Sequence, residues 1–483
     1  MVRLFGSGQA GLGGMMMTKK AKVIVSDLHL GAGYFAAGNF MEDFVKDNEF
    51  AAFLGGFRAE SEAQNTDFEL IIAGDMVEFL QVPAIASFSP RAMYPPEDFY
   101  PATEEASVLK INLVIQGHPT FFAALRDWLR PAEPRRTLTI LKGNHDVNLH
   151  WPGVQERIRQ AIGATGERAP LLTFVEQEIS REGIYVEHGN QYAEKINRFD
   201  DFTAPYDPND PDELVTPPGS QFVIEFFNDV EHEKWWVDSI KPITALIWYG
   251  FALDFDFAAR VLVNFLRVAP ILIAGSLEAE PSGGIAAEVD SLCRELSDGF
   301  RVYELGQRYN RDKTFRRQFH ARVSRVLRAI EPPSAKAAAM PEPVTALAQA
   351  QGIEEQLRTD LRDVAQEKIR QEGVRLVVFG HTHRALCAPL DGGVYLNSGT
   401  WTWQRNFEGA DLETWRDFYA HPEKYTEPHY LTYVRVDYDA DGQPTGRVLD
   451  YTGQLIIECP PAPEEKPWWA RFIAWLKRLL GLR

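Results

Sequence analysis

The sequence predicts an α/β fold in which polar side chains gather along one rim of a sheet. Short apolar runs alternate with longer stretches of helical periodicity, a pattern typical of sheets covered by helices. A loop that contains histidine, aspartate or asparagine follows most of these apolar runs. Because strand ends in such folds share one edge, these loops are expected to lie close together.

Length, composition and charge bound the class of protein. The 483 residues are 45% apolar and 24% charged, which indicates a globular chain with two or three domains, or one domain with a large insertion. The formal net charge of −18 argues against a nucleic-acid backbone as the main partner, since proteins that bind it carry basic surfaces. The isolated residues Cys293, Cys387 and Cys459 predict a reducing, cytoplasmic setting rather than a disulfide framework.

The predicted core occupies residues 21–200 and 371–459. Residues 1–20 precede it as a flexible leader, because they hold no apolar run of the length that a secretory signal needs. Short β-branched and aliphatic runs predict strands at Lys22–Ser26, Phe68–Ala73, the first half of Thr137–Asp146, Gly183–Glu187, Val374–Phe379, Gly393–Asn397 and Tyr430–Tyr438. Apolar residues at helical spacing predict helices at Asn39–Ala63, within Glu104–Arg130 and at Trp151–Ile162.

Residues 201–370 interrupt this alternation and are expected to form a helical insertion, or cap. They begin with a loop rich in Pro and Asp and continue with long helical patterns. The longest apolar run, Ile243–Leu253, has 11 residues, whereas a membrane span needs about 18. A cap that packs its apolar face on the core is therefore preferred to a lid that faces lipid.

Residues 460–483 are expected to form a linker and an amphipathic helix. A Pro- and Glu-rich linker leads into residues 467–483, where three tryptophans and several aliphatic residues fall on one half of a helical wheel. Basic residues occupy the other half, as in helices that lie in an anionic membrane surface. This pattern predicts peripheral attachment to the inner face of a membrane, and the alternative is a helix that docks on the protein itself or on a partner.

Eight polar residues on the strand-end loops are the candidates for chemistry: Asp27, His29, Asp75, Asn144, His145, His188, His381 and His383. Imidazole mixed with carboxylate suits borderline divalent metals, and the absence of thiolate argues against a structural zinc site. If His145 is the proton carrier, seven ligands remain, which are too many for one ion. They suit two ions about 3.5–4 Å apart, which would clamp a phosphoryl displacement and acidify water. Gly143 would let the backbone turn where a side chain would collide.

The motifs that hold these residues resemble those of the calcineurin-type metallophosphoesterase family. They are Asp27-x-His29, Gly74-Asp75, Gly143-Asn144-His145-Asp146, His188-Gly189 and Gly380-His381-x-His383. The five occur in order, and the resemblance covers roughly residues 20–200 and 372–455. It implies a sandwich of two mixed sheets flanked by helices. It also implies hydrolysis of phosphomonoesters, phosphodiesters or pyrophosphates.

The resemblance also implies residue roles. One ion would be held by Asp27, His29 and His383, the other by Asn144, His188 and His381, and Asp75 would bridge the two. Manganese is preferred, with iron or zinc as alternatives. His145 would be the general acid, oriented by Asp146.

Three further polar residues have weaker assignments. Arg384 and Asn190 are candidates for contact with a phosphate. Glu78 is either a supporting residue of the site or a strand-end charge.

Cap and tail together favour a membrane-associated or lipid-linked phosphate substrate. Two rival readings remain. One is a soluble phosphodiesterase or phosphatase that acts on nucleotides or phosphoproteins. The other is a binding scaffold that keeps the fold without catalysis.

Overall fold

The computed structural model describes residues 19–130, 133–193, 195–241, 243–274, 283–330, 361–407, 409–426 and 431–460. The predicted leader and the predicted tail therefore lie outside the described residues, apart from Lys19, Lys20 and Pro460.

The larger of two mixed sheets has seven strands in the order β16-β15-β14-β1-β2-β3-β4. Their bounds are β1 Lys19–Val25, β2 Thr66–Ala73, β3 Arg136–Leu141, β4 Leu172–Val175, β14 Thr432–Tyr438, β15 Pro444–Asp450 and β16 Leu455–Ile457. The strands β1 to β4 run parallel, whereas β14 to β16 form an antiparallel extension that begins beside β1. The carboxyl ends of the four parallel strands therefore meet at one edge.

The smaller sheet has five strands in the order β11-β12-β10-β6-β5. Their bounds are β5 Glu178–Arg181, β6 Ile184–Glu187, β10 Leu376–Phe379, β11 Leu386–Leu390 and β12 Gly393–Asn397. The central strand β10 is parallel to both of its neighbours, and the two edge strands are antiparallel. The carboxyl ends of β6 and β10 thus also share an edge.

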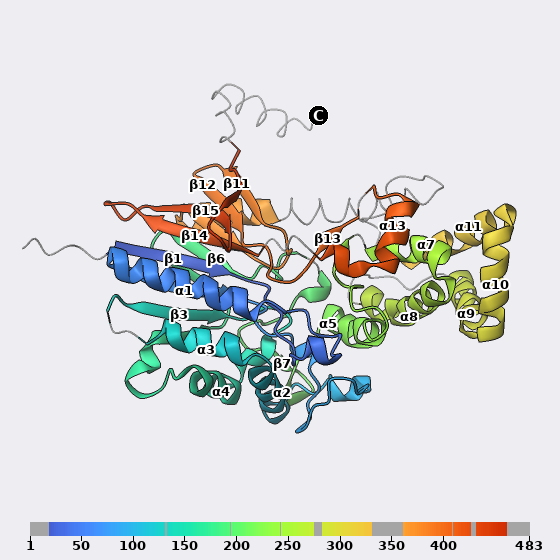
Figure 1. Cartoon of the computed structure of the whole chain (residues 1–483), viewed down its shortest axis with the longest axis horizontal. Helices are drawn as coiled ribbons and strands as arrows, with labels where there is room; N and C mark the ends of the chain where they lie inside the picture. The colour runs from blue at the N-terminus through green and yellow to red at the C-terminus, as the bar shows by residue number, and fades with distance from the viewer. Residues whose placement is uncertain are drawn as a thin grey trace, which may run out of the picture.

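The two sheets pack face to face, and helices cover their outer faces. Strand residues alternate between the two faces: Ile24 of β1 joins the apolar cluster between the sheets, whereas Val23 and Val25 join the cluster under the helices. The helices on that outer side are α1 Asp47–Gln64, α2 Glu104–Gly117, α3 Pro119–Trp128 and α4 Pro152–Ile162 (Figure 1). The helix over residues 361–372 covers the smaller sheet through Leu361, Ala365 and Ile369. The predicted α/β class is confirmed.

One predicted helix begins later in the structure than expected. The helix expected from Asn39 begins only at Asp47, because the preceding residues form a loop in which Glu42 accepts hydrogen bonds from the backbone N–H groups of Gly31 and Phe44. The helical pattern predicted within Glu104–Arg130 is confirmed and comprises the two helices α2 and α3. Its break falls before Pro119, whose ring lacks the N–H that a helix interior needs and which is suited to a first helical turn.

The insertion forms a second apolar cluster that joins most of its helices. These are α5 Pro218–Phe222, α6 Asn228–Val230, α7 Ile243–Leu253, α8 Phe255–Ala274, α9 Gly283–Ser297, α10 Gly299–Arg311 and α11 Lys313–Ile330. The helix α7 coincides with the long apolar run, and its Trp248 and Phe251 are buried in this cluster. Within the described residues, no helix is both long enough and apolar enough to cross a membrane.

The cluster of the insertion also includes residues from the last part of the core segment. Trp403 and Phe407, together with Trp415 and Phe418 of α13 Leu412–Ala420, pack within it. In addition, β9 Ile240–Lys241 pairs with β13 Arg405–Asn406. The stretch that follows the smaller sheet therefore ties the insertion to the core.

One expectation about the cysteines is wrong. Cys387 of β11 and Cys459 form a disulfide, with Cα atoms 5.0 Å apart, although 72 residues separate them in sequence. Packing of β11 against β15 brings the two segments together, which spacing alone did not reveal. Cys293 is free. Cysteine usage therefore no longer supports the predicted reducing setting.

Candidate metal centre

The candidate residues follow five parallel strands from both sheets. Asp27 and His29 come after β1, Asp75 after β2, and Asn144 with His145 after β3 of the larger sheet. His188 comes after β6, and His381 with His383 after β10 of the smaller sheet. The structure brings the acidic and histidine side chains among them into three overlapping groups whose ligand atoms lie within 4.8 Å of one another.

Unusual backbone geometry marks the same loops. In the described parts of the chain, eight non-glycine residues have positive φ, and five of them are Asp27, His29, Asp75, His381 and His383. Such conformations cost on the order of 1–3 kcal/mol each and persist where the surroundings enforce them, often at functional sites. Here they turn the side chains of neighbouring loops toward a common point.

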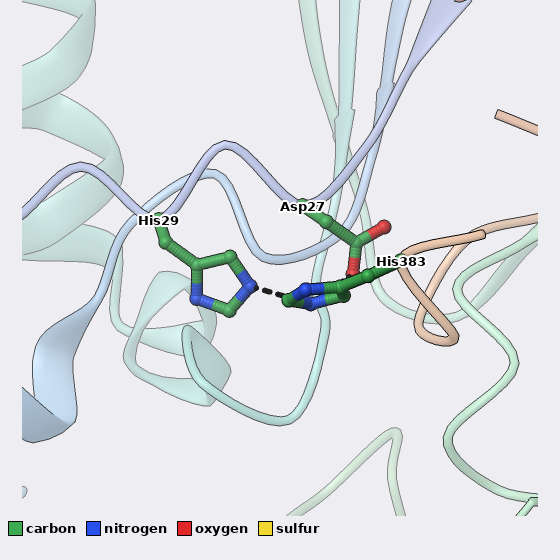
Figure 2. Close-up of side chains that lie close together, drawn as sticks. All are labelled: Asp27, His29 and His383. Atoms are coloured by element: carbon green, nitrogen blue, oxygen red, sulfur yellow. Dashed lines mark hydrogen bonds and ion pairs between the residues drawn. The ribbon is translucent and has the colours of Figure 1, made fainter. Parts of the chain in front are cut away.

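The first group comprises Asp27, His29 and His383 (Figure 2). The Nε2 atoms of His29 and His383 lie 3.1 Å apart, and His383 Nε2 lies 3.3 Å from Asp27 Oδ1. The outer nitrogen of His383 is anchored, because Gln404 Nε2 donates to its Nδ1 at 2.6 Å. The two Nε2 atoms and one carboxylate oxygen thus converge on a single position.

The second group comprises Asp75, His188 and His381. His188 is fully buried and its Nδ1 lies 3.0 Å from the carbonyl oxygen of Ala73, which directs Nε2 toward Asp75 Oδ2 at 3.0 Å. The same Oδ2 lies 3.9 Å from His29 Nε2 of the first group. Asp75 is therefore placed between the two groups.

The side chain of Asn144 indicates whether the position beside Asp75 suits a cation. Its side chain is 3% exposed, and its Oδ1 has no hydrogen-bond partner among the residues that the structure describes. The neighbouring His145 donates its backbone N–H to Asp75 Oδ1 at 2.9 Å, so the asparagine lies beside the shared carboxylate. A buried carbonyl oxygen without a partner costs about 1–3 kcal/mol, which a bound cation would offset. The set of imidazole, carboxylate and amide donors fits borderline divalent metals.

Two motif glycines make room for the carboxylates. A Cβ atom on Gly143 would collide with Oδ1 of Asp75, and one on Gly380 would lie 2.6 Å from Oδ2 of Asp27. Real Cβ atoms do not approach oxygen so closely, so the loops after β3 and β10 can take these paths only without side chains. The expectation that a side chain at position 143 would collide is confirmed.

Glu78 links the first group to His145. It is 2% exposed, and its Oε2 accepts hydrogen bonds of 2.6 Å from Nδ1 of both His29 and His145. Burial opposes the charge of this carboxylate, but the charge and hydrogen bonds of the two histidines outweigh burial and lower its pKa to about 2. Glu78 therefore fixes two imidazole rings with Nε2 directed away from it. The sequence had left open whether this residue supports the site.

The expectation that Asp146 orients His145 is wrong. Its Oδ1 accepts from the backbone N–H of Gly143 at 2.5 Å, and its Oδ2 from that of Met76 at 2.7 Å. The carboxylate thus joins the loop after β3 to the loop after β2. Burial and the charge of Asp75 raise its pKa to about 7.

The charges of the site depend on one another. Burial opposes the charge of Asp75, but His188 and His145 outweigh burial and hold its pKa well below the usual range. Burial likewise opposes the charge of His188, while Asp75 raises its pKa to about 10. For His145, Glu78 and Asp75 outweigh burial and raise the pKa to about 9. Protons on these rings balance the carboxylates, and metal ions would take over that role.

The two candidate phosphate contacts differ in their surroundings. Asn190 is fully buried, and its Nδ2 donates to the carbonyl oxygen of Asn197 at 3.0 Å, which ties the amide to its own loop. Arg384 is partly buried and directly follows His383. Contact of either residue with a phosphate stays a prediction.

The insertion reaches the edge of the site. The lining of one cavity includes Asn144 and Lys110 of the core together with Ser220 and Ile224 of the insertion. Gln81 Nε2, on the loop after Glu78, donates to Glu231 Oε2 of the insertion at 2.6 Å. The insertion is thus fastened beside the loops that hold the candidate ligands.

Comparison with known proteins adds no assignment. No protein-family model matches the chain, and no curated protein matches it either.

Proposed function

We propose that the protein is a two-metal phosphoester hydrolase with the sandwich fold of the calcineurin-type metallophosphoesterases. The observation that carries the proposal is the position of Asp75, whose Oδ2 lies 3.0 Å from His188 Nε2 and 3.9 Å from His29 Nε2. A carboxylate shared by two histidine groups suits a pair of divalent ions rather than a single one. The ordered motifs of the sequence support the same reading.

In this proposal, Asp27, His29 and His383 would hold one ion, Asn144, His188 and His381 would hold the other, and Asp75 would serve both. The ions, when bound, would neutralise phosphate oxygens and lower the pKa of an attacking water. Glu78 occupies Nδ1 of His145, so the Nε2 atom is the one that can give a proton to the leaving oxygen. His145 is then the general acid and Glu78 its positioning residue.

The proposed substrates are phosphate esters, among which a membrane-associated or lipid-linked phosphate agrees with the insertion at the edge of the site. Soluble nucleotides and phosphoproteins are the alternative. The metal ligands would be the same for each of these substrates. Substrate preference therefore depends on the residues that surround the metal centre rather than on the ligands.

The experiment combines elemental analysis of purified protein with turnover of a monoester, a diester and a pyrophosphate in the presence of Mn²⁺. We expect about two transition-metal ions per chain, and Asp75→Ala should lose both the ions and the activity. Asp441→Ala, at an exposed acidic residue in a remote turn, serves as the control. Active protein without metal, or an Asp75→Ala variant that keeps both ions, would overturn the proposal.

A further inference from the structure

The end of the insertion differs in charge from the rest of the chain. Residues 299–317, which cover α10 and the start of α11, hold six basic side chains and two acidic ones, whereas the whole chain has a formal net charge of −18. A local excess of positive charge on an acidic protein indicates either ion pairs within the protein or a surface that binds an anionic partner.

Part of this charge is matched within the insertion. Arg301 pairs with Asp298 at 3.7 Å, and Arg308 pairs with Asp312 at 3.7 Å. Arg316 donates to the backbone carbonyl oxygens of Tyr309 and Asn310. These contacts account for three of the six basic side chains.

The remaining three basic side chains are Arg311, Lys313 and Arg317. All three are exposed, and none forms an ion pair with a residue in the parts of the chain that the structure describes. They lie at the end of α10 and in the first turns of α11. Their charges are therefore available to a partner.

Two aromatic side chains on the same helix are also open to solvent. Phe300 is 73% exposed and Tyr303 is 67% exposed, although Val302, Tyr309 and other apolar residues of the insertion are buried in its cluster. Residues 300, 303 and 311 are separated by three and eight positions, which places them along one face of a helix. The exposed Glu304 lies on the same face, between the two aromatic side chains at its beginning and Arg311 at its end.

This surface lies at one extremity of the molecule. Figure 1 shows α10 and α11 at the end of the long axis, far from the two sheets. Charges farther apart than about 8 Å are largely screened at physiological salt, so the acidic remainder of the protein does not cancel a contact made by this end.

We infer that the insertion tip, formed by Phe300, Tyr303, Arg311, Lys313 and Arg317, docks on an anionic lipid surface. Basic side chains attract the phosphates and carboxylates of anionic lipids. Exposed aromatic rings beside them enter the interface between head groups and acyl chains. A single-stranded nucleic acid would instead need a positive groove that follows its backbone, whereas the three basic side chains gather where α10 ends and α11 begins.

The inference is separate from the proposed activity and from the predicted tail. It concerns residues remote from the metal ligands, so hydrolysis of a small soluble ester should be unaffected by changes at the tip. It also concerns a surface within the described residues, whereas residues 467–483 lie outside them.

The test measures co-sedimentation of the full-length protein with phosphatidylcholine vesicles that contain or lack phosphatidylserine. Two variants address the tip: Phe300→Ser with Tyr303→Ser, and Arg311→Glu with Lys313→Glu and Arg317→Glu. The matched control reverses three exposed basic residues elsewhere, Arg135, Arg168 and Arg416, to Glu. A fourth variant reverses Arg471, Lys477 and Arg478 of the tail. Thermal melts and turnover of a soluble ester show that each variant is folded.

We expect wild-type protein to bind only the vesicles that contain phosphatidylserine. The basic tip variant should lose on the order of 100-fold in partition coefficient, together with most of the salt dependence. The aromatic variant should bind severalfold less tightly and keep its salt dependence, while the control behaves as wild type.

Equal binding of wild type and both tip variants would overturn the inference, as would binding lost only in the tail variant. Retention of single-stranded RNA in place of vesicles, sensitive to the same tip residues, would assign the surface to nucleic acid and also overturn it.

Discussion

At the scale of single residues, one carboxylate connects the candidate metal ligands with the candidate acid. Glu78 Oε2 accepts hydrogen bonds of 2.6 Å from both His29 and His145. A metal-bound imidazole commonly donates its second nitrogen to a carboxylate, which fixes the tautomer and the orientation of the ring. The shared oxygen therefore sets the position of a ligand and of the proton donor together.

The first prediction concerns the donor itself. His145→Ala should leave the metal content nearly intact and lower kcat by on the order of 10²–10⁴, the usual contribution of a positioned acid. The loss should shrink for substrates with good leaving groups, which need little protonation. Because His145 also lies within 4.8 Å of His29 and Asp75 as a possible ligand, metal analysis is the decisive measurement. A variant that has lost metal would make His145 a ligand and contradict the assignment.

Glu78→Gln tests the positioning role. The amide keeps the size of the side chain but removes the charge that holds both rings, so metal affinity should fall about 10- to 100-fold and kcat should fall with it. With metal held at saturation, the remaining loss in kcat should largely vanish in the His145→Ala background, because the two residues act through one another. Metal titrations and a double-mutant cycle give these numbers. Additive losses would mean that Glu78 does not act through His145.

Gly143→Ala addresses the space around the shared carboxylate. The new Cβ would collide with Oδ1 of Asp75, so we expect loss of bound metal and of activity. The control is Gly56→Ala within α1, where a Cβ meets nothing within 4 Å and should stabilise the helix by up to about 1 kcal/mol. Metal content and thermal melts of the two variants distinguish a local clash from a general effect of alanine. Full metal content in Gly143→Ala would contradict the geometry.

At the scale of elements, periodicity and local composition predicted the strands that carry the site. The runs at Lys22–Ser26, Phe68–Ala73 and Val374–Phe379 overlap β1, β2 and β10, and Gly393–Asn397 matches β12. Buried parallel strands are recognisable because both of their faces are apolar. The edge strands β5 and β16 and the neighbouring strand β15 were not predicted, since they are short or partly exposed and carry polar residues.

Contacts between distant elements were less predictable. The strand-end rule predicted that Asp27, Asp75, His188, His381 and His383 lie close together, because the four strands that precede them end at adjacent edges of the two sheets. The sequence could not reveal which hydrogen-bond partner each carboxylate of the site has. Asp146 follows His145 directly and yet bonds backbone N–H groups, while Glu78 reaches His145 from another loop. The disulfide between Cys387 and Cys459 was likewise unpredictable, because it joins two segments that lie 72 residues apart in sequence and meet only in the folded protein.

The insertion has an apolar cluster of its own, which leads to a prediction about its stability. Phe251 of α7 is fully buried, and its ring centroid lies 5.2 Å from that of Phe255 and 5.0 Å from that of Phe319. Phe251→Ala should cost about 3–5 kcal/mol by leaving a cavity, whereas Phe300→Ala at an exposed position should change stability by less than about 0.5 kcal/mol. Thermal unfolding and metal content are measured for both. Loss of metal in Phe251→Ala would show that the insertion is needed to hold the site.

At the scale of the whole molecule, the candidate metal centre lies where the two sheets meet. Asp27, His29, Asp75 and Asn144 follow strands of the larger sheet, and His188, His381 and His383 follow strands of the smaller one. Each proposed ion would take ligands from both sheets. The ions would therefore join the halves of the sandwich at the edge where the strained loops of both sheets converge.

This arrangement predicts that metal binding stabilises the whole fold. A ligand that binds only the native state stabilises it by about 2.7 kcal/mol at a free concentration 100 times its Kd, and two occupied sites add to the effect. Adding Mn²⁺ to chelator-treated protein should raise the melting temperature in a concentration-dependent way, and a chelator should reverse the shift. Asp75→Asn, which weakens the shared ligand, should abolish most of the shift, while His145→Ala should retain it. Calorimetry separates these outcomes from loss of activity, because it needs no substrate. A melting temperature that does not respond to Mn²⁺ or chelator in the wild-type protein would mean that these loops hold no ion across the two sheets.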